Sequence, residues 1–288
     1  MRRLLTASVL AVVVVLAGSA APAQSTPPYV FLQLSDPQFG MFTQDREFAQ
    51  ETANFEFAAA NVNRLKPDFV VITGDLVNKP GDTAQIAEYD RIRKIIDPAI
   101  PVYEMPGNHD VENAPTPESL AAYKARYQRD RYVFRHKNLL GIVLNSTLIH
   151  TPEKAPVALA EQDQWVRAEL AKAKTSGARH IVIFQHHPWF IESADEPDDY
   201  FNLPLVRRTP LLALFRDAGV RTLISGHFHR NAVANDSGFH AVVTGAVGMP
   251  LGGSQSGFRA FRVTDNEISH RYFTFGEIPA AIDPSKAF

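Results

Sequence analysis

Short apolar segments rich in β-branched residues alternate along the chain with longer segments in which apolar residues recur at helical spacing. Predicted strands cover residues 29–35, 68–73, 101–105, 132–135, 139–145, 180–185 and 220–225, and predicted helices cover residues 48–65, 84–96, 117–127, 160–173 and 205–218. Strands that alternate with helices are typical of α/β proteins. The segment at 180–185 is almost uninterruptedly apolar, which is typical of a strand buried on both faces.

The last part of the chain has a different pattern, because strand-like segments at 239–244, 258–264 and 267–275 follow one another without helices. We expect these strands to form an antiparallel sheet that closes the fold. The whole pattern predicts two sheets packed face to face with helices outside. We find no internal repeat within residues 29–288, so we expect one domain there, preceded by a Pro-containing linker at 24–28.

The amino terminus has the three-part pattern of a secretory signal peptide. Arg2 and Arg3 precede an apolar run at 4–17, and Ala21-Pro22-Ala23 ends the segment. A membrane anchor is the alternative, but the run is shorter than the roughly 20 residues of a spanning helix. We therefore predict a signal peptide at 1–23 with cleavage after Ala23, a periplasmic or secreted protein, and no stable membrane insertion after its removal.

Composition excludes several kinds of function. The chain has 29 basic and 31 acidic residues, a net charge of −2, and removal of Arg2 and Arg3 with the signal peptide would leave 27 basic residues and a net charge near −4. This balance provides no basic face for nucleic acid, so no nucleic-acid partner is expected. Cysteine is absent, which excludes disulfides and thiolate ligands, so any metal ion must be bound by nitrogen and oxygen.

Residues of the kinds that bind metal ions follow five of the predicted strands. The five motifs are Asp36 with Gln38, Gly74-Asp75, Gly107-Asn108-His109-Asp110, His186-His187-Pro188, and Gly226-His227-Phe228-His229. In open α/β sheets the carboxyl ends of the strands are where ligands bind, because the loops converge there. We expect Gly74, Gly107 and Gly226 to let the backbone turn sharply at these ends.

The inventory suits a pair of metal ions about 3.5–4 Å apart with a shared carboxylate and a bridging hydroxide. By residue type and order we assign Asp36, Gln38 and His229 to one ion, Asn108, His186 and His227 to the other, and Asp75 as the bridge. His109 is the candidate for protonating the leaving alkoxide, because it is adjacent to Asn108. Asp110 is expected to hold the His109 ring, although it would serve equally as a cap of the following segment.

These motifs, in this order, resemble those of the calcineurin-like metallophosphoesterase superfamily. The resemblance implies a four-layer α/β/β/α sandwich, two bound metal ions and a phosphate ester substrate. It runs from about Tyr29 to Phe275. Four segments are similar in sequence to one branch of this superfamily: Ser35-Asp36-Pro37-Gln38-Phe39-Gly40, Asp163-Gln164-Trp165, Asp198-Asp199-Tyr200-Phe201-Asn202-Leu203 and Gly226-His227-Phe228-His229-Arg230-Asn231. That branch is the one of animal calcineurin-like phosphoesterase domain-containing protein 1, described as a serine/threonine protein phosphatase.

Two positions depart from the wider superfamily. Gln38 stands where most members have His, so an amide oxygen replaces an imidazole nitrogen and favours a harder ion. Two divalent or trivalent ions are expected, Mn or Fe in preference to Zn. Asn78 stands where purple acid phosphatases are expected to have a Tyr that binds iron, so we do not expect a purple protein.

The predicted activity is hydrolysis of phosphate monoesters, phosphoserine and phosphothreonine proteins among them, by a metal-bound hydroxide. The alternatives are a phosphodiesterase acting on nucleotides or phospholipid head groups, and a metal-bound binding protein without catalysis. His187 is expected to pack or lie at the surface. The acidic residues within 195–199 form either a lid or a solvated loop, and Arg230 contacts either phosphate or that loop. Substrate identity and oligomeric state are left open.

Overall fold

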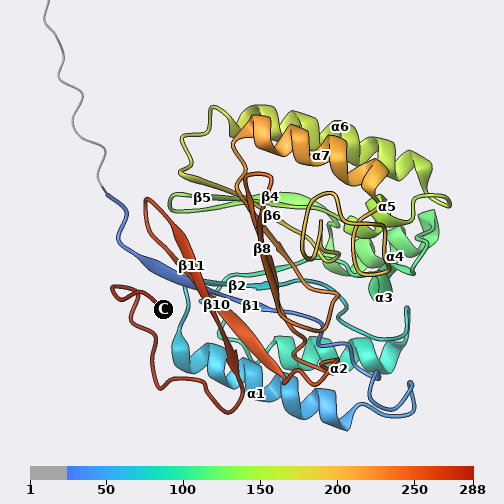
Figure 1. Ribbon diagram of the computed structural model, residues 1–288. Coiled ribbons are helices and arrows are strands. Elements are labelled where there is room, and N and C mark those ends of the chain that lie inside the picture. Colours follow the sequence, from blue (N-terminus) through green and yellow to red (C-terminus); the bar gives the residue numbers. More distant parts are fainter. Residues whose placement is uncertain (1–24) are drawn as a thin grey trace, which may run out of the picture.

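The computed structural model describes residues 25–288, and the predicted signal peptide lies outside this range. Two mixed sheets pack face to face (Figure 1). The five-stranded sheet has the order β11 (Ile268–Thr274), β10 (Gly257–Val263), β1 (Tyr29–Leu34), β2 (Phe69–Ile72) and β3 (Val102–Glu104). The six-stranded sheet has the order β4 (Tyr132–His136), β5 (Leu139–Val143), β6 (His180–Phe184), β7 (Thr222–Ser225), β9 (Phe239–Val243) and β8 (Ala232–Asp236).

Helices cover the outer face of each sheet, which confirms the predicted α/β/β/α arrangement. Figure 1 shows α1 (Ala49–Leu65) and α2 (Thr83–Arg93) on one side of the molecule and α6 (Pro156–Ala173) and α7 (Leu205–Ala218) on the opposite side. The remaining described helices are α3 (Asn108–Val111), α4 (Pro117–Tyr127) and α5 (Ser146–His150). No helix among residues 25–288 combines the length and the apolar character that crossing a bilayer requires.

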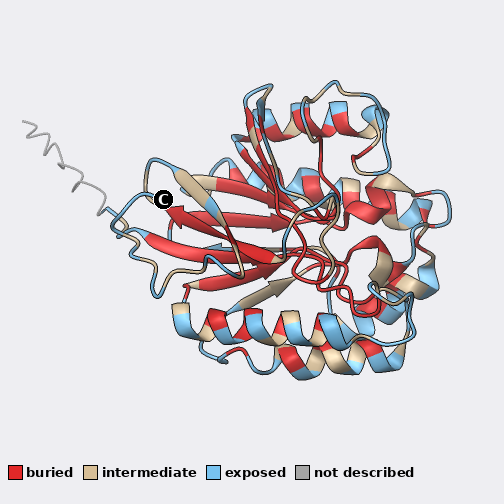
Figure 2. Ribbon diagram, turned by 60° about the horizontal axis from the view of Figure 1, so that its bottom comes forward, coloured by how far each residue is buried: buried red, intermediate tan, exposed pale blue. Residues whose placement is uncertain are grey.

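Alternation along the strands divides the apolar residues into an inner and an outer core. In β1, Tyr29 and Phe31 face the other sheet, whereas Val30, Leu32 and Leu34 belong to the core beneath the helices. Phe31 stacks between Phe69 and Phe261, with both ring centroids 4.6 Å away. Figure 2 shows that the strands, and the loops at one end of them, are buried. The two sheets therefore fix the origins of those loops rigidly.

The strands at the carboxyl end of the chain do not form one closing antiparallel sheet, and that expectation was wrong. β9 pairs in parallel with β7 in the six-stranded sheet, whereas β10 and β11 extend the five-stranded sheet antiparallel to β1. The unpredicted strand β8 explains the difference, because it forms a hairpin with β9 through the left-handed turn at Ser237 and Gly238. Its sequence, Ala-Val-Ala-Asn-Asp, lacks a strand pattern because β8 is an edge strand.

Candidate active site

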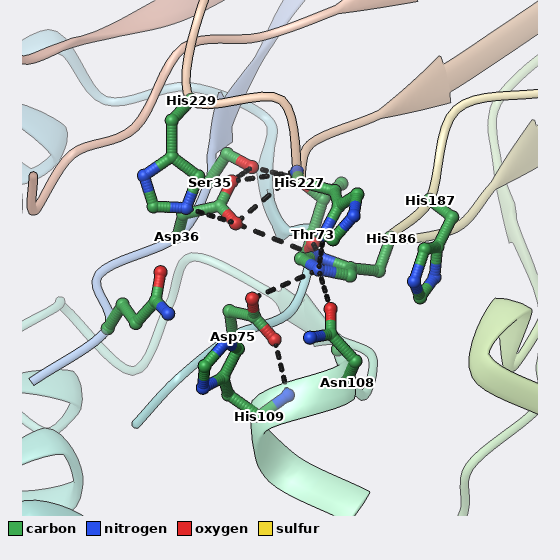
Figure 3. A network of polar contacts seen from close by, with 12 residues as sticks. Ser35, Asp36, Thr73, Asp75, Asn108, His109, His186, His187, His227 and His229 are labelled. Carbon is green, nitrogen blue, oxygen red and sulfur yellow. Dashed lines mark hydrogen bonds and ion pairs between the residues drawn. The ribbon is translucent and has the colours of Figure 1, made fainter. Parts of the chain in front are cut away.

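The five predicted motifs lie close together, where strands of both sheets have their carboxyl ends (Figure 3). Asp36, Asp75 and Asn108 follow β1, β2 and β3 of the five-stranded sheet, and the histidines follow β6 and β7 of the six-stranded sheet. All seven predicted ligands are buried: Asp36, Gln38, Asp75, Asn108, His186, His227 and His229. Residues distant in sequence are thus brought together because parallel strands end at the same side.

Two groups of side chains have the geometry of cation sites and share one carboxylate. One group is Asp75, His186 and His227, and the other is Asp36, Asp75 and His229; within each group the ligand atoms lie within 4.8 Å of one another. The two groups contain the Asp and His residues of the two predicted ligand sets, with Asp75 common to both. Each group combines residues from both sheets, so the site exists only where the sheets face each other.

Electron-donating atoms converge in the first group. Nε2 of His186 lies 3.0 Å from Oδ1 of Asn108, 3.1 Å from Nδ1 of His227 and 3.1 Å from an Asp75 carboxylate oxygen. Asn108 donates its own amide hydrogen to Asn113 at 2.7 Å, which fixes the amide with its oxygen toward His186. Separations of about 3 Å are those between adjacent ligands of an octahedral ion with bonds of about 2.1 Å.

The histidine tautomers show that these donors point lone pairs at one another. Nδ1 of His186 donates to the carbonyl oxygen of Thr73 at 2.8 Å, and Nε2 of His227 donates to the carbonyl oxygen of Tyr200 at 3.1 Å. When both rings are neutral, the opposite ring nitrogens, which face each other, carry lone pairs. Such an arrangement is repulsive unless a positive charge lies between the atoms, so the residues present fit a metal ion.

The second group has the same construction. Nδ1 of His229 donates to the carbonyl oxygen of Met249, and Nε2 of His229 faces Oδ1 of Asp36 at 3.3 Å. Oδ2 of Asp36 accepts hydrogen bonds from the Ser35 hydroxyl and from the backbone N–H of His227. Oε1 of the buried Gln38 has no hydrogen-bond partner among the described residues. A buried amide oxygen without a partner is costly, and a cation would satisfy it.

The electrostatics of the site indicate a strongly negative position between the ligands. Burial alone would raise the pKa values of Asp36 and Asp75, but His229 and His186 outweigh it at Asp36, and His186 and His109 outweigh it at Asp75, so both pKa values lie below the ordinary range. Burial lowers the pKa of His186, but the Asp75 and Asp36 carboxylates outweigh it and raise that pKa to about 9. One proton on Nε2 serves only one acceptor, whereas a metal ion would serve all of them.

The backbone at the ligands is strained. Asp36, Gln38, Asp75, His227 and His229 all have positive φ, between 39° and 65°. Residues other than glycine rarely adopt this left-handed conformation, which costs of the order of 1–3 kcal/mol at each position. Five such residues in one site indicate that the surrounding fold holds the ligands in place for a function.

The glycines of the motifs serve two different purposes. Gly74 has a φ of 85° and turns the chain, as predicted. Gly107 and Gly226 do not have a positive φ, so another feature makes glycine necessary there. A Cβ at Gly107 would collide with the Asp75 carboxylate, and one at Gly226 would collide with the Ser35 hydroxyl. These two glycines are required because other ligand-bearing loops pass directly over them.

His109 is held beside Asp75, but not by the residue that we expected. Its backbone N–H donates to Asp75 Oδ1 at 2.9 Å, and its ring Nδ1 lies 2.6 Å from the carbonyl oxygen of Asn78. Asp110 does not contact the ring. Its carboxylate accepts hydrogen bonds from the backbone N–H groups of Leu76 and Gly107. The prediction that Asp110 orients the ring was therefore wrong, and the carbonyl oxygen of Asn78 orients it. Asp110 instead caps α3 and joins two of the loops that carry ligands.

Backbone carbonyl oxygens hold every histidine of the site, and sequence reasoning missed them. The carbonyl oxygens belong to Thr73, Asn78, Tyr200 and Met249. Every residue has a carbonyl group, so no residue type signals this role.

His187 does not lie at the surface, which was one of the two expectations for it, because its side chain is buried. Its Nδ1 shares a hydrogen bond with Ser146 Oγ, 2.9 Å away, and its ring centroid lies 4.3 Å from that of His227.

The acidic segment 195–199 belongs to the loop that overhangs the site. Tyr200 follows it and contacts His227 through its carbonyl oxygen and its ring, while half of its surface is exposed. The carboxylates themselves have local partners: Glu196 accepts from the backbone N–H of Ile191, and Asp198 accepts from that of Leu205 at the start of α7. The guanidinium of Arg230 lies 4.0 Å from the Phe228 ring centroid, so it packs on an aromatic ring.

This fold and site define a metal-dependent phosphoric ester hydrolase. Residues 29–231 match the model of the calcineurin-like phosphoesterases, and the chain belongs to that family. It is 38% identical over 267 residues to the serine/threonine-protein phosphatase CPPED1 of Homo sapiens, and 37% identical over 266 residues to that of Bos taurus. Each alignment covers 87% of this chain and 85% of the relative.

A solved structure of similar fold is that of a dimetal phosphatase from Danio rerio. Its TM-score is 0.63 at 15% sequence identity, over 87% of this chain and 97% of that one. At this identity the likeness concerns the fold, and it agrees with the arrangement of two sheets between helices described above.

Replacement of the shared carboxylate should abolish the metal centre. We expect Asp75→Asn to reduce bound Mn from two ions per chain to fewer than one, because both groups lose a charged ligand. Metal content after equilibrium dialysis, measured by atomic emission, checks this. The buried Asp130 lies outside the site, so Asp130→Asn should keep two ions. Retention of both ions by Asp75→Asn would contradict the assignment.

Proposed function

We propose that the protein is exported and hydrolyses phosphate monoesters with two metal ions held between its two sheets. The observation that carries the proposal is the pair of donor groups that share Asp75, with His109 fixed beside that carboxylate. Asp36, Gln38 and His229 would hold one ion, Asn108, His186 and His227 the other, and Asp75 both. When bound, such ions activate water and neutralise charge on the phosphoryl oxygens.

The residues of the chain would perform the remaining steps. His109 would protonate the leaving alkoxide from Nε2, because hydrogen bonding of Nδ1 to the Asn78 carbonyl oxygen leaves Nε2 free to carry and release a proton. The backbone N–H of His109 donates to Asp75, so the proton donor is held beside the shared ligand. Tyr200 would border the entrance for the substrate.

The amide oxygen of Gln38 supports Mn or Fe as the metal. Oxygen ligands suit harder ions, and Gln38 is the one neutral oxygen donor among the three residues assigned to its ion, where many relatives are expected to have imidazole. Zn remains the alternative for the ion bound by two histidines. The relatives named above are serine/threonine-protein phosphatases by name. Phosphoserine and phosphothreonine esters are accordingly the first substrates to test.

Activity on model esters tests the reaction and its alternatives. With Mn added, we expect turnover of p-nitrophenyl phosphate and of a phosphoserine peptide, and slower turnover of bis(p-nitrophenyl) phosphate, measured by release of p-nitrophenol or inorganic phosphate. Preference for the bis ester would show a phosphodiesterase instead. Absence of turnover on every ester, with two ions confirmed bound, would contradict hydrolysis and favour a binding protein.

Removal of the proton donor should separate catalysis from metal binding. We expect His109→Ala to lower kcat by about 10²- to 10⁴-fold on an alkyl phosphate, because general acid catalysis contributes about this much, while two ions stay bound. Metal analysis and steady-state kinetics on the same sample check both. His136→Ala, which removes a ring that contacts Asp68 away from the site, is the matched control and should keep wild-type kcat. Loss of metal in His109→Ala would make His109 a ligand.

Export rests on the sequence of residues 1–23 alone. Expression of the full chain in a host with a secretory pathway should yield a protein outside the cytoplasm whose first residue is Gln24. Amino-terminal sequencing of the recovered protein checks the cleavage site. A full-length chain that stays in the cytoplasmic fraction would contradict the proposal, and a full-length chain in the membrane fraction would support the anchor.

A further inference from the structure

The layer between the two sheets changes from apolar to polar as it approaches the site. In β1 and β10 the aromatic residues Phe31 and Phe261 stack on each other, and nearer the site Gln33 and Arg259 take their places, paired in register. Both polar side chains are buried. A buried glutamine and a buried arginine between two sheets are costly unless their hydrogen bonds are complete. Their partners therefore show what the pair does.

The Arg259 guanidinium has only neutral partners in the structure. Nε donates to Thr244 Oγ1 at 3.0 Å, one NH2 group donates to Asn231 Oδ1 at 2.6 Å, and the other lies 2.9 Å from Nδ1 of His270. Burial lowers the pKa of Arg259 to about 10, so the side chain is still charged at neutral pH. Burial and Arg259 lower the pKa of His270 to about 3, so that ring is neutral and accepts.

A continuous series of hydrogen bonds runs from this cation toward the metal centre. Thr244 Oγ1 donates to Gln33 Oε1 at 2.5 Å, and Gln33 Nε2 donates to Thr73 Oγ1 at 3.0 Å. Thr73 Oγ1 donates to Ser35 Oγ at 2.8 Å, and Ser35 Oγ donates to Oδ2 of Asp36. Every member is buried. We name these six residues, Arg259, Thr244, Gln33, Thr73, Ser35 and Asp36, the Arg259–Asp36 relay.

The direction of the relay is fixed at three points. Arg259 is a donor only, and the Asp36 carboxylate is an acceptor only, so each hydroxyl between them accepts from one side and donates to the other. In the middle, Gln33 Nε2 also donates to the carbonyl oxygen of Ser225 at 2.9 Å, which fixes the amide orientation. Thr73 has an alternative acceptor, the Leu34 carbonyl oxygen, but at a longer 3.3 Å.

The consequence appears at Asp36, whose two oxygens are in different situations. Oδ2 alone accepts from the Ser35 hydroxyl, whereas Oδ1 faces His229 Nε2 at 3.3 Å. The backbone N–H of His227 is shared between the two oxygens, 3.1 Å from Oδ2 and 3.3 Å from Oδ1. Hydrogen bonds in a polarised series strengthen one another. Loss of the cation at the far end would let Thr244, Thr73 and Ser35 reorient, and Oδ2 would be held less firmly.

We propose that Arg259 and Thr244 are positioning residues for the metal centre, acting through the Arg259–Asp36 relay to hold Asp36 with Oδ1 toward the ion bound by Asp36, Gln38 and His229. The inference rests on the proposed two-ion centre and adds residues that lie in the core between the sheets. An ordinary structural role for Arg259 would affect stability alone, whereas the relay affects one ion and spares the other.

Metal titration of relay variants tests this. Two dissociation constants for Mn are measured on ion-free protein by calorimetry, with electron paramagnetic resonance to count bound ions. His229→Ala and His227→Ala show which constant belongs to which ion. We expect Ser35→Ala to raise the dissociation constant of the ion assigned with His229→Ala by about 10-fold, as loss of a residue that orients a ligand does. Thr244→Val should raise the same constant by about 3-fold. The ion marked by His227 should keep its constant.

A double-variant cycle distinguishes a relay from two separate effects. In the Ser35→Ala background, Thr244→Val should change the same constant by less than about 2-fold, because the path to Asp36 is already broken. Arg259→Gln should behave like Thr244→Val if it folds, and Thr244→Val keeps the proposal testable if it does not. Independent, multiplying effects of Ser35→Ala and Thr244→Val would overturn the relay.

Two controls separate the relay from general damage to the core. Thr147→Val removes a buried hydroxyl that has no partner among the described residues, and should leave both constants unchanged. Val182→Ala makes a cavity in the same inter-sheet layer, and should lower the thermal unfolding midpoint while leaving both constants unchanged. The relay is overturned if Thr244→Val leaves both dissociation constants unchanged or raises both equally. Wild-type protein that binds fewer than two ions overturns the two-ion centre itself.

Discussion

The structure depends on the need for positive charge where Asp75, Asn108, His186 and His227 meet. Three kinds of electron donor lie about 3 Å from one nitrogen, and the hydrogen bonds on the far sides of both rings leave lone pairs facing inward when the rings are neutral. Without a cation this would be among the least favourable places in the molecule. The strained backbone at five ligands and the collisions that exclude a Cβ at two glycines follow from crowding these donors together. The fold supplies the rigidity that such crowding requires.

Much of the site could be predicted because it depends on residue type and on position at a strand end. Asp36, Asp75, Asn108, His186, His227 and His229 met where the alternation of strands and helices placed them. What could not be predicted depends on three-dimensional contacts without a residue signature. The carbonyl oxygens of Asn78, Thr73, Tyr200 and Met249 orient the histidines, and the nearest acidic neighbour in sequence, Asp110, turned out to cap a helix.

The fold shows the same distinction. Buried strands carry a strong apolar pattern: β6 was predicted at 180–185 and lies at His180–Phe184, and β5 and β7 were predicted within two residues of their observed ends. The edge strand β8 carries none, because it packs on one neighbour only, and its absence from the prediction led to the wrong sheet for β9. Gln33 and Arg259 would have been hard to place from sequence for the opposite reason: polar residues within strands usually face solvent, and only the register of β1 and β10 puts them in the interior.

Each cation group draws ligands from both sheets, and this has a consequence for the order of folding. The five-stranded sheet carries the carboxylates and amides, and the six-stranded sheet carries the imidazoles, so neither layer alone has more than part of a coordination sphere. An unfolded or half-assembled chain would compete poorly for metal, and capture of ions would come after the layers dock. Bound ions would then stabilise the assembled state, by a free energy that rises with the logarithm of their free concentration, and would slow the separation of the two sheets.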